Sequence, residues 1–508
     1  MTDAVGGEGD VSIVIVGGGY AGMMAANRLL GSLNRKERER VRVRIVNPTD
    51  RFVHRIRLHE HAAGIANASL DLRSMIHAET AVVLGTGAQI EPDAQVLHVH
   101  TVTGEQQLAY DWLIYAVGSH GASQTPGVSE FAVPIADVDG AAEIARQMNT
   151  KDVRGVCVVG GGQAGVETAA ELAEAHPATT VTLIAGSELV SAMRPAARKS
   201  IRRRLQRRGV TVLDSLHVLK VTPRGVHTDD GVRREFDLVV WAAEFEVPEL
   251  AARSGLPVDS IGRLLVDDTL QCVADAHILG AGDAVKPPYT VSAHLPMGAR
   301  TALPMGGAAA DTLLAHLRHQ NPRPISIGLL GPSISLGRRD GYVQLAHPDD
   351  TPTRIAVTGW AGAATAGPRS CHPARRHPGR SRRVSRALRL PRRRVSAGAG
   401  RRRAPTVSIC RRRRLDQSLV TRAAPFLEEH VLSTPATSFL SFALVEGYVV
   451  VRWGDHGGHP TSESPTAGPP RPARASCRRC ACAEAGIRTV REPVRLLPVP
   501  VRKRPEID

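Results

Sequence analysis

The sequence predicts an α/β fold with two doubly wound domains, each built on a parallel sheet. Two observations predict it. A short, apolar, β-rich run ends in glycines and is followed by a helical pattern and a second strand. This whole unit then occurs again, about 145 residues further along the chain. A repeated β–turn–α–β unit is typical of doubly wound sheets.

The first copy of the unit opens the chain. Residues 11–16 (VSIVIV) read as a buried parallel strand, residues 21–30 as a helix, and residues 34–40 as a charged connection to a second strand at 41–46. Three later strand-like runs are expected to complete this copy: 81–84, 96–99 and 112–116.

The second copy follows the same order. It has a strand at 156–159, a helix that runs through Glu174, and a strand at 180–184. Its later strands are expected at 209–213 and 238–242.

Each copy carries glycines in the spacing Gly-x-Gly-x-x-Gly directly after its first strand. In the first copy these are Gly17, Gly19 and Gly22, with Tyr20 and Ala21 between the last two. The first glycine permits a tight turn, the second lets a pyrophosphate approach the backbone, and the third allows close helix–strand packing. The anion then binds free N–H groups at the helix N-terminus. This Rossmann-like pattern predicts a dinucleotide site.

The second copy repeats the pattern with Gly160, Gly162 and Gly165. Two such turns predict two bound dinucleotides, or one site that has become silent. In the first copy, Asn47 stands where an acid commonly binds the ribose hydroxyls, and its amide can still hydrogen-bond a diol.

The second copy has no acid at the corresponding place, residues 184–186. Arg194 and Arg198 lie downstream, and they are either ligands of a 2′-phosphate or ordinary surface charges. The choice between NADH and NADPH stays open, with NADH slightly favoured.

Four motifs in this order resemble the pyridine-nucleotide/FAD oxidoreductase family and, within it, the type II NADH dehydrogenases. They are the two glycine turns, residues 110–119 (YDWLIYAVGS) and residues 278–284 (ILGAGDA). The resemblance covers about residues 11–360. It implies that FAD and NAD(P)H bind, that Gly118 lies where the chain crosses between domains, and that Asp283 hydrogen-bonds the flavin's ribityl chain.

The resemblance also implies a domain order in which the NAD(P)H domain is inserted into the FAD domain. Residues 11–135 and 245–322 are expected to form the FAD-binding domain, and 136–244 the NAD(P)H-binding domain. A small β-containing C-terminal segment, 323–360, precedes a low-complexity basic tail, 361–508.

By the same resemblance, hydride passes from nicotinamide to flavin, and electrons then pass to a small-molecule acceptor. Glu167 matches an acid that the family places near the nicotinamide; the alternative is a carboxylate that merely favours the N-terminal half of its helix. Residues 51–64 (RFVHRIRLHEHAAG) lack the CxxxxC pair of the disulfide reductases, which excludes their usual dithiol chemistry.

The acceptor is less well defined. The family's quinone segment corresponds to residues 299–306 (ARTALPMG), where Arg300 and Met305 replace its two glutamines and should border the acceptor. A fixed cation at 300 favours an anionic or strongly polar acceptor over a plain quinone headgroup, so quinone remains one option. Glu244 stands where relatives usually have glycine, and a side chain there would crowd a close backbone approach.

The net charge of +16 belongs to the tail. Residues 361–508 hold 30 Lys and Arg against 10 Asp and Glu, whereas the residues before them hold 35 against 39. The tail is expected to be either a disordered polybasic extension or a frameshift product, because GC-rich DNA read out of frame yields this composition. Two alternatives to a working enzyme follow: a defective dehydrogenase, or a redox-responsive flavin-binding interaction protein similar to apoptosis-inducing factors.

Location is predicted from what the sequence lacks. Only Cys157 and Cys272 precede the tail, which favours a reducing compartment. The first residues have no signal-peptide pattern, and no run reaches the roughly 18 apolar residues of a spanning helix. We expect a cytoplasmic protein, either free or peripheral at the inner face of the cell membrane.

Metal and nucleic-acid sites are not favoured. The CxxC spacing within residues 477–482 has no second ligand pair at zinc-finger distance. The three histidines at positions 54, 59 and 61 are interpreted as surface or loop residues. The arginine runs 401–403 and 411–414 lack interleaved aromatic residues, so base stacking is not expected. The oligomeric state is left open.

Overall fold

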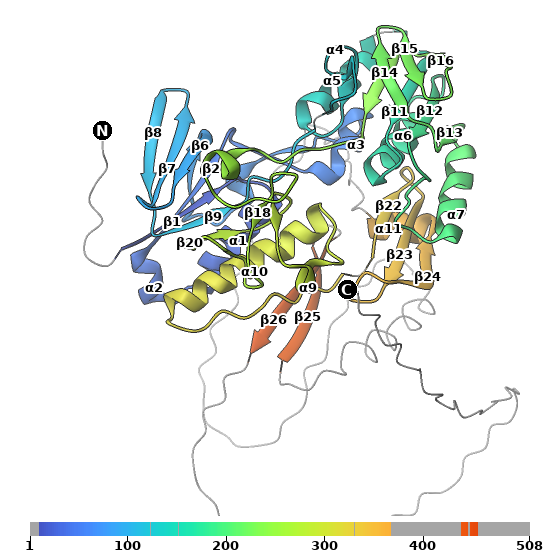
Figure 1. Cartoon of the computed structure of the whole chain (residues 1–508). Helices are drawn as coiled ribbons and strands as arrows, with labels where there is room; N and C mark the ends of the chain where they lie inside the picture. The colour runs from blue at the N-terminus through green and yellow to red at the C-terminus, as the bar shows by residue number, and fades with distance from the viewer. Residues whose placement is uncertain are drawn as a thin grey trace, which may run out of the picture. The chain divides into compact units, whose positions relative to one another are not determined.

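The computed structural model describes residues 10–121, 123–150, 152–329, 331–366, 438–445 and 448–455. Residues 10–366 belong to one compact unit (Figure 1). Strands β25 (Ser438–Val445) and β26 (Tyr448–Asp455) pair with each other in a two-stranded sheet. The CxxC spacing and the arginine runs of the tail lie outside the described residues.

The first sheet has six strands in the order β19-β20-β9-β1-β2-β5. Their bounds are β1 (Val11–Val16), β2 (Val41–Asn47), β5 (Ala81–Leu84), β9 (Trp112–Tyr115), β19 (Gln271–Cys272) and β20 (Asp275–Gly280). All neighbours are parallel except β19 and β20. The side chains of residues 13–16 are buried on both faces of the sheet, which explains why these four residues of β1 are all apolar.

Two helices lie side by side against this sheet, α1 (Tyr20–Ser32) and α10 (Ala299–Leu317) (Figure 1). They approach closely at Gly306, where an added Cβ would lie 2.1 Å from the carbonyl oxygen of Ala21. Small residues on α10 therefore let it pack directly over the start of α1.

The charged connection expected at residues 34–40 is instead a short helix, α2 (Arg35–Arg40). Asn34 caps it: its side chain accepts a hydrogen bond from the Glu37 N–H, and the Glu37 carboxylate accepts one from the Asn34 N–H. This reciprocal pair is a capping box, which satisfies backbone donors at a helix start. The high charge of this segment obscured the capping pattern in the sequence.

The strand expected at residues 96–99 is present, but it does not belong to the first main sheet. It belongs to β7 (Val96–Thr101), which pairs antiparallel with β6 (Thr86–Glu91) and β8 (Gly104–Ala109) in a separate sheet. Only alternate residues of β7 are buried, as in a sheet with one face covered.

The second main sheet has five strands in the order β10-β17-β11-β12-β13, and all neighbours are parallel. The bounds are β10 (Val133–Pro134), β11 (Gly155–Val159), β12 (Thr180–Ala185), β13 (Thr211–Asp214) and β17 (Leu238–Trp241), with helices α5 (Val138–Thr150), α6 (Gln163–Ala175) and α7 (Pro195–Gln206). Two parallel sheets with crossover helices confirm the predicted fold class.

Smaller elements complete the unit. An antiparallel sheet of β14 (Val218–Thr222), β15 (Gly225–Thr228) and β16 (Arg233–Glu235) is inserted before β17. The remaining short elements are β3 (Arg51–Val53), β4 (Ser69–Asp71), α4 (Val128–Phe131), α8 (Leu250–Arg253), β18 (Leu264–Leu265), β21 (Val285–Lys286), α9 (Tyr289–Ser292) and 3-10 turns at Arg55–Arg57 and Leu72–Ser74.

Two segments distant in sequence join the core of the second sheet. Helix α3 (Leu58–Ala62) follows β3, yet it packs against α5 and α6. The C-terminal segment, with β22 (Ser333–Ser335), β23 (Gly341–Ala346), β24 (Pro352–Thr358) and α11 (Gly359–Ala366), contributes Ile334 and Leu336 to the same buried cluster. Both segments thereby reach α6, the helix that follows the second glycine turn.

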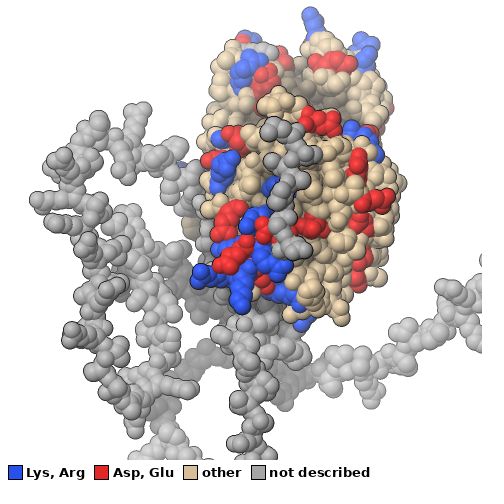
Figure 2. Space-filling view, turned by 90° about the vertical axis from the view of Figure 1, so that its left-hand side faces the viewer, with Lys and Arg blue, Asp and Glu red and all other residues tan. Residues whose placement is uncertain are grey.

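The surface shown in Figure 2 carries acidic and basic side chains intermixed rather than a patch of one sign. This agrees with the near balance of charge in the residues before the tail. Among the described residues, no helix combines the length and the apolar character needed to cross a membrane.

Candidate functional site

A pocket of about 1440 Å³ extends from the turn after β1 to the turn after β11. Its walls include residues from both main sheets, from α10 and from the C-terminal segment. Pockets for single small molecules usually measure about 300–1,000 Å³, so this one has room for more than one ligand.

The first glycine turn has the geometry of a phosphate cradle. Gly17 has φ +107°, and a Cβ there would lie 2.3 Å from the carbonyl oxygen of Ala116. A Cβ on Gly22 would lie 1.9 Å from the carbonyl oxygen of Gly17, whereas a Cβ on Gly19 would meet nothing within 4 Å. The outer glycines are therefore required by packing, and the middle one leaves the backbone accessible.

The second turn repeats this geometry. Gly160 has φ +133°, a Cβ on Gly165 would lie 1.9 Å from the carbonyl oxygen of Gly160, and Gly162 faces open space. Helices α1 and α6 both begin without a side-chain cap and without an acid in the first turn. Their first N–H groups are thus available to an anion.

Asn47 lines the pocket and also holds the first turn. Its Oδ1 accepts a hydrogen bond from the Gly18 N–H at 2.9 Å, and its Nδ2 donates to the carbonyl oxygen of Thr49 at 2.8 Å. Tyr20 and Ala21, at the start of α1, line the same part of the pocket. A role of Asn47 toward a ribose stays a prediction.

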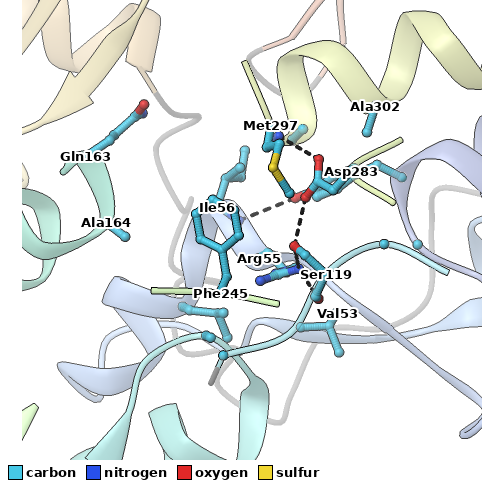
Figure 3. A pocket seen from close by; sticks show the side chains of 18 of the residues that line it. Val53, Arg55, Ile56, Ser119, Gln163, Ala164, Phe245, Asp283, Met297 and Ala302 are labelled. Carbon is cyan, nitrogen blue, oxygen red and sulfur yellow. Dashed lines mark hydrogen bonds between the residues drawn. The ribbon is translucent and has the colours of Figure 1, made fainter. Parts of the chain in front are cut away.

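Asp283 lies at the centre of a hydrogen-bond chain (Figure 3). Its Oδ2 accepts from the Ser119 hydroxyl at 2.9 Å and its Oδ1 accepts from the Gly298 N–H at 2.7 Å. Arg55 Nη1 donates to the carbonyl oxygen of Ser119 at 2.7 Å. Gly118, directly before Ser119, lines the pocket with φ +70°. The chain links the crossing segment to the start of α10.

Apolar side chains also face the pocket. Ile56, Phe245 and Met297 line it, and Figure 3 shows them around one space. Ile56 is 38 % exposed and Phe245 is 54 % exposed, which leaves flat apolar surface for a ring to contact. Sequence reasoning had missed Arg55, Ile56 and Phe245, because all three lie outside any motif.

Glu167 lies on α6 with its carboxylate almost fully buried. Its Oε1 accepts a hydrogen bond from the Ser335 N–H at 2.9 Å, and its Oε2 lies 3.7 Å from His59 Nδ1. Burial raises the pKa of Glu167 to about 8, and the nearby carboxylates of Glu171 and Glu60 add to the rise. The carboxyl group is therefore mainly protonated at neutral pH.

The three histidines have different surroundings. The interpretation as surface or loop residues is wrong for His59, which is 7 % exposed within α3, and burial lowers its pKa to about 4. Burial also lowers the pKa of His54 to about 4. His61 Nδ1 accepts a hydrogen bond from the Ala68 N–H.

Arg300 lines the pocket, but its charge is already paired. Its Nη1 and Nη2 contact the two carboxylate oxygens of Asp350 at 2.9 and 2.7 Å. A bidentate pair of this kind neutralises the cation, which corrects the expectation that Arg300 favours an anionic acceptor. Met305 is 2 % exposed in the core between α10 and the sheet, and it is absent from the residues that line the pocket.

The two arginines considered for a 2′-phosphate also have protein partners. Arg194 Nη1 donates to the carbonyl oxygen of Thr353 at 2.8 Å. Arg198 forms an ion pair with Glu188 at 2.7 Å and donates to the carbonyl oxygen of Met193 at 2.9 Å. Neither is an uncommitted phosphate ligand.

Glu244 adopts a conformation that glycine adopts more readily. It has φ +59°, and it borders the pocket with its side chain exposed. Exposure relieves the crowding expected from the sequence, while the backbone keeps the left-handed geometry.

Cys157 and Cys272 are buried free thiols. Within the described ranges, no group of three or more His, Cys, Asp or Glu side chains is placed to hold a metal ion.

The fold and the pocket together define the class of protein. The two main sheets each present a matched glycine turn to one pocket, and the half-buried Asp283 accepts a hydrogen bond from Ser119 in the segment that crosses between them. These are the features of a flavoprotein with two dinucleotide-binding folds. The family model of the pyridine nucleotide-disulphide oxidoreductases matches residues 11–306, and the chain belongs to this family. It is an NAD(P)H oxidoreductase flavoenzyme whose cofactors are FAD and NAD(P)H.

Individual relatives agree with this assignment. The chain is 30 % identical over 292 residues to an NADH dehydrogenase-like protein of Mycobacterium tuberculosis, covering 53 % of this chain and 72 % of the relative. It is 24 % identical over 378 residues to the type II NADH:quinone oxidoreductase of Haemophilus influenzae, covering 64 % and 85 %. The structure of NDH2 from Plasmodium falciparum in complex with NADH superposes with a TM-score of 0.59 at 15 % identity, covering 69 % of this chain and 92 % of that one.

Proposed function

We propose that this protein transfers electrons from NADH, through FAD, to a neutral acceptor of the quinone class. The observation that carries the proposal is the single pocket, which both glycine turns and Asp283 line. Ligands bound at the two helix N-termini can therefore extend toward each other inside one cavity.

The residues divide into two sets. Gly17, Gly19, Gly22, Tyr20, Ala21, Asn47, Gly118 and Asp283 would hold FAD, and Gly160, Gly162, Gly165 and Glu167 would hold the nicotinamide nucleotide. Bound FAD supplies the ring that takes hydride from the nicotinamide and passes electrons on. The protein's part is to orient the two ligands and exclude water.

NADH is proposed over NADPH because of the charges near the end of β12. The strand ends without an acid, but Arg194 and Arg198 are each bound to protein groups. A 2′-phosphate would have to break one of these arrangements before it gained a cation.

The proposed acceptor is neutral because of what borders it. Asp350 neutralises Arg300, and the neighbouring surface of Ile56, Phe245 and Met297 is apolar. Such a site disfavours a strongly anionic acceptor and suits a ring with few charges. The name of the Haemophilus influenzae relative, an NADH:quinone oxidoreductase, supports the same class.

Anaerobic stopped-flow spectroscopy tests the proposal. The bound flavin is mixed with NADH or NADPH, and the reduced protein is then mixed with a short-chain quinone, ferricyanide or oxygen. We expect NADH to bleach the flavin faster than NADPH, and the quinone to restore its colour faster than oxygen. A protein that binds no FAD, or whose flavin neither nucleotide reduces, would contradict the proposal.

We further propose a cytoplasmic location, either free or in peripheral contact with the inner face of the cell membrane. Cell fractionation with a high-salt wash distinguishes the two forms, since a peripheral protein is released by salt. Recovery in the exported fraction would contradict this location.

A further inference from the structure

The pocket wall beside Glu167 is a segment bound along one face of α6. Residues 333–338 run along four polar residues on one face of this helix. Each of the four forms a hydrogen bond with the segment. The contacts are Gln163 Nε2 to the Ser333 carbonyl oxygen, Ser335 N–H to Glu167, Arg338 Nη2 to Glu171 at 2.8 Å, and Arg338 N–H to Glu174 at 3.1 Å.

Arg338 also joins this wall to α3. Its Nη2 lies 2.9 Å from Glu60 Oε1 and 2.8 Å from Glu171 Oε1. Glu171 is fully buried and Glu60 nearly so, and Glu60 has a second cation in Arg57 at 2.8 Å. A single guanidinium therefore bridges carboxylates from α3 and α6, two helices about 110 residues apart in sequence.

Arg338 acts to lower the pKa of both carboxylates. Burial favours the neutral form of Glu60, yet the hydrogen bond from Arg338 and the charge of Arg57 bring its pKa below the usual value. Burial raises the pKa of Glu171, and Arg338 opposes the rise. Buried carboxylates without a paired cation take up a proton instead.

The charges of this cluster affect the pKa of Glu167. Glu171 follows Glu167 by one helical turn, and the carboxylates of Glu171 and Glu60 both favour the protonated form of Glu167. The other ionisable groups that face the cluster are His59 on α3, Glu174 on α6 and Arg208, two residues after the end of α7. Arg208 pairs with Glu174 at 3.8 Å.

We propose that Arg338 is a positioning residue for the nicotinamide side of the pocket: it bridges the carboxylates of Glu60 and Glu171 and holds the wall at 333–338 against Glu167. The inference rests on the proposed function, because it assigns a further residue to the nicotinamide side of that site. Without Arg338, the buried Glu60 and Glu171 lose the cation that bridges them, and the Ser335 N–H moves away from Glu167.

The test compares Arg338→Met, Arg338→Lys and Arg338→Met with Glu171→Gln in the FAD-loaded protein. Asp340→Asn is the matched control, since Asp340 follows the segment by two residues, pairs with Arg204 and Arg208, and does not line the pocket. Two quantities are measured from about pH 5.5 to 9: NAD⁺ affinity of the oxidised protein by calorimetry, and the rate of flavin reduction by NADH.

Arg338→Met is expected to move the apparent pKa of both profiles by about one unit or more and to weaken NAD⁺ binding about tenfold. Adding Glu171→Gln should restore the profile, and Arg338→Lys should keep the charge but lose part of the affinity. Asp340→Asn should lower only the melting temperature. If Arg338→Met does not fold, Glu171→Gln alone must still shift both profiles.

Profiles of Arg338→Met, or of Glu171→Gln in its place, that superimpose on the wild type would overturn the inference and leave Arg338 a purely structural residue. Failure of the proposed function has a different signature, because the wild-type flavin would then not be reduced by either nucleotide.

Discussion

The two glycine turns have nearly the same backbone but different surroundings. Two residues after the third glycine, α1 carries Met24 and α6 carries Glu167. Met24 packs near Gly307 of α10, in a stretch of small residues at 306–310 (GGAAA). Glu167 instead binds the Ser335 N–H of a segment held by carboxylates and one arginine.

This difference matches the two cofactors that the turns would hold. Met24 and Gly307 carry no group that titrates, and the ion pair that joins α1 to α10, Arg28 with Asp311 at 2.8 Å, is exposed, so we expect the first turn to respond little to pH. A wall built on buried carboxylates responds to charge, as suits a nucleotide that must bind and leave in every turnover. We expect the same substitution to have different consequences on the two sides.

The largest effect is expected from Gly22→Ala compared with Gly165→Ala. Each added Cβ would lie 1.9 Å from a backbone oxygen, so the turn must open. Gly22→Ala should yield protein without flavin colour, whereas Gly165→Ala should keep FAD and bind NADH at least about tenfold more weakly. Absorbance of the purified protein and a titration with NADH measure the two outcomes.

The control is Gly19→Ala, where an added Cβ meets nothing within 4 Å. It should leave the melting temperature of the flavin-free protein unchanged while FAD binding weakens. Equal loss of FAD in Gly22→Ala and Gly165→Ala would refute the division of labour between the turns.

A second, smaller effect concerns pH. The folded pKa of Glu167, about 8, is above the ordinary glutamate value of 4.5, so the native state holds a proton that the unfolded chain releases. Stability from this group is present below about pH 4.5 and declines as pH rises toward 8. Glu167→Gln should remove that decline and leave the variant more stable than wild type above pH 8, by about 1.4 kcal/mol for each pKa unit of the shift.

Urea unfolding of the two proteins at several pH values measures this. Glu174→Gln serves as the comparison on the same helix, because Glu174 is one-third exposed. Parallel stability curves for Glu167→Gln and wild type would show that the buried carboxyl does not hold its proton, and the contrast with Met24 would lose its basis.

The features encoded by local spacing could be predicted from the sequence. Both glycine turns, the parallel sheets and the pocket position of Asp283 follow from short motifs with a strand before and a helix after. Helix α2 had an equally local signal, Asn34 followed by Glu37, that charge obscured.

Contacts between distant segments could not be predicted in this way. Arg300 is neutralised by Asp350, 50 residues away on a loop, and a single sequence gives no spacing rule for such a pair. The same holds for Arg338, whose partners Glu60 and Glu171 come from two other helices. The charge of a pocket therefore depends on tertiary pairing that the residue types alone do not reveal.

Asp350→Asn tests the acceptor side of the pocket, where we expect a several-fold change in the rate of reoxidation. The change leaves the Arg300 guanidinium without a countercharge next to the pocket. Reoxidation of reduced protein by ferricyanide should then become about five times faster at low salt, while a neutral quinone is little affected. The gain should disappear at high ionic strength. An equal change for both acceptors would point to altered packing instead.

The smallest effect is expected where the chain returns from the second sheet. The outward crossing uses Gly118 with φ +70°, whereas the return uses Glu244 with φ +59°. A left-handed conformation costs a residue with a side chain about 1–2 kcal/mol, and glycine avoids this cost. The unfolded chain is more flexible with glycine, which offsets part of the gain in stability. Glu244→Gly should therefore stabilise the protein by about 0.5–1 kcal/mol in urea unfolding. Glu244→Ala removes the same charge but keeps the Cβ, so it should bring no gain; equal stabilisation by both variants would assign the effect to charge rather than to the backbone.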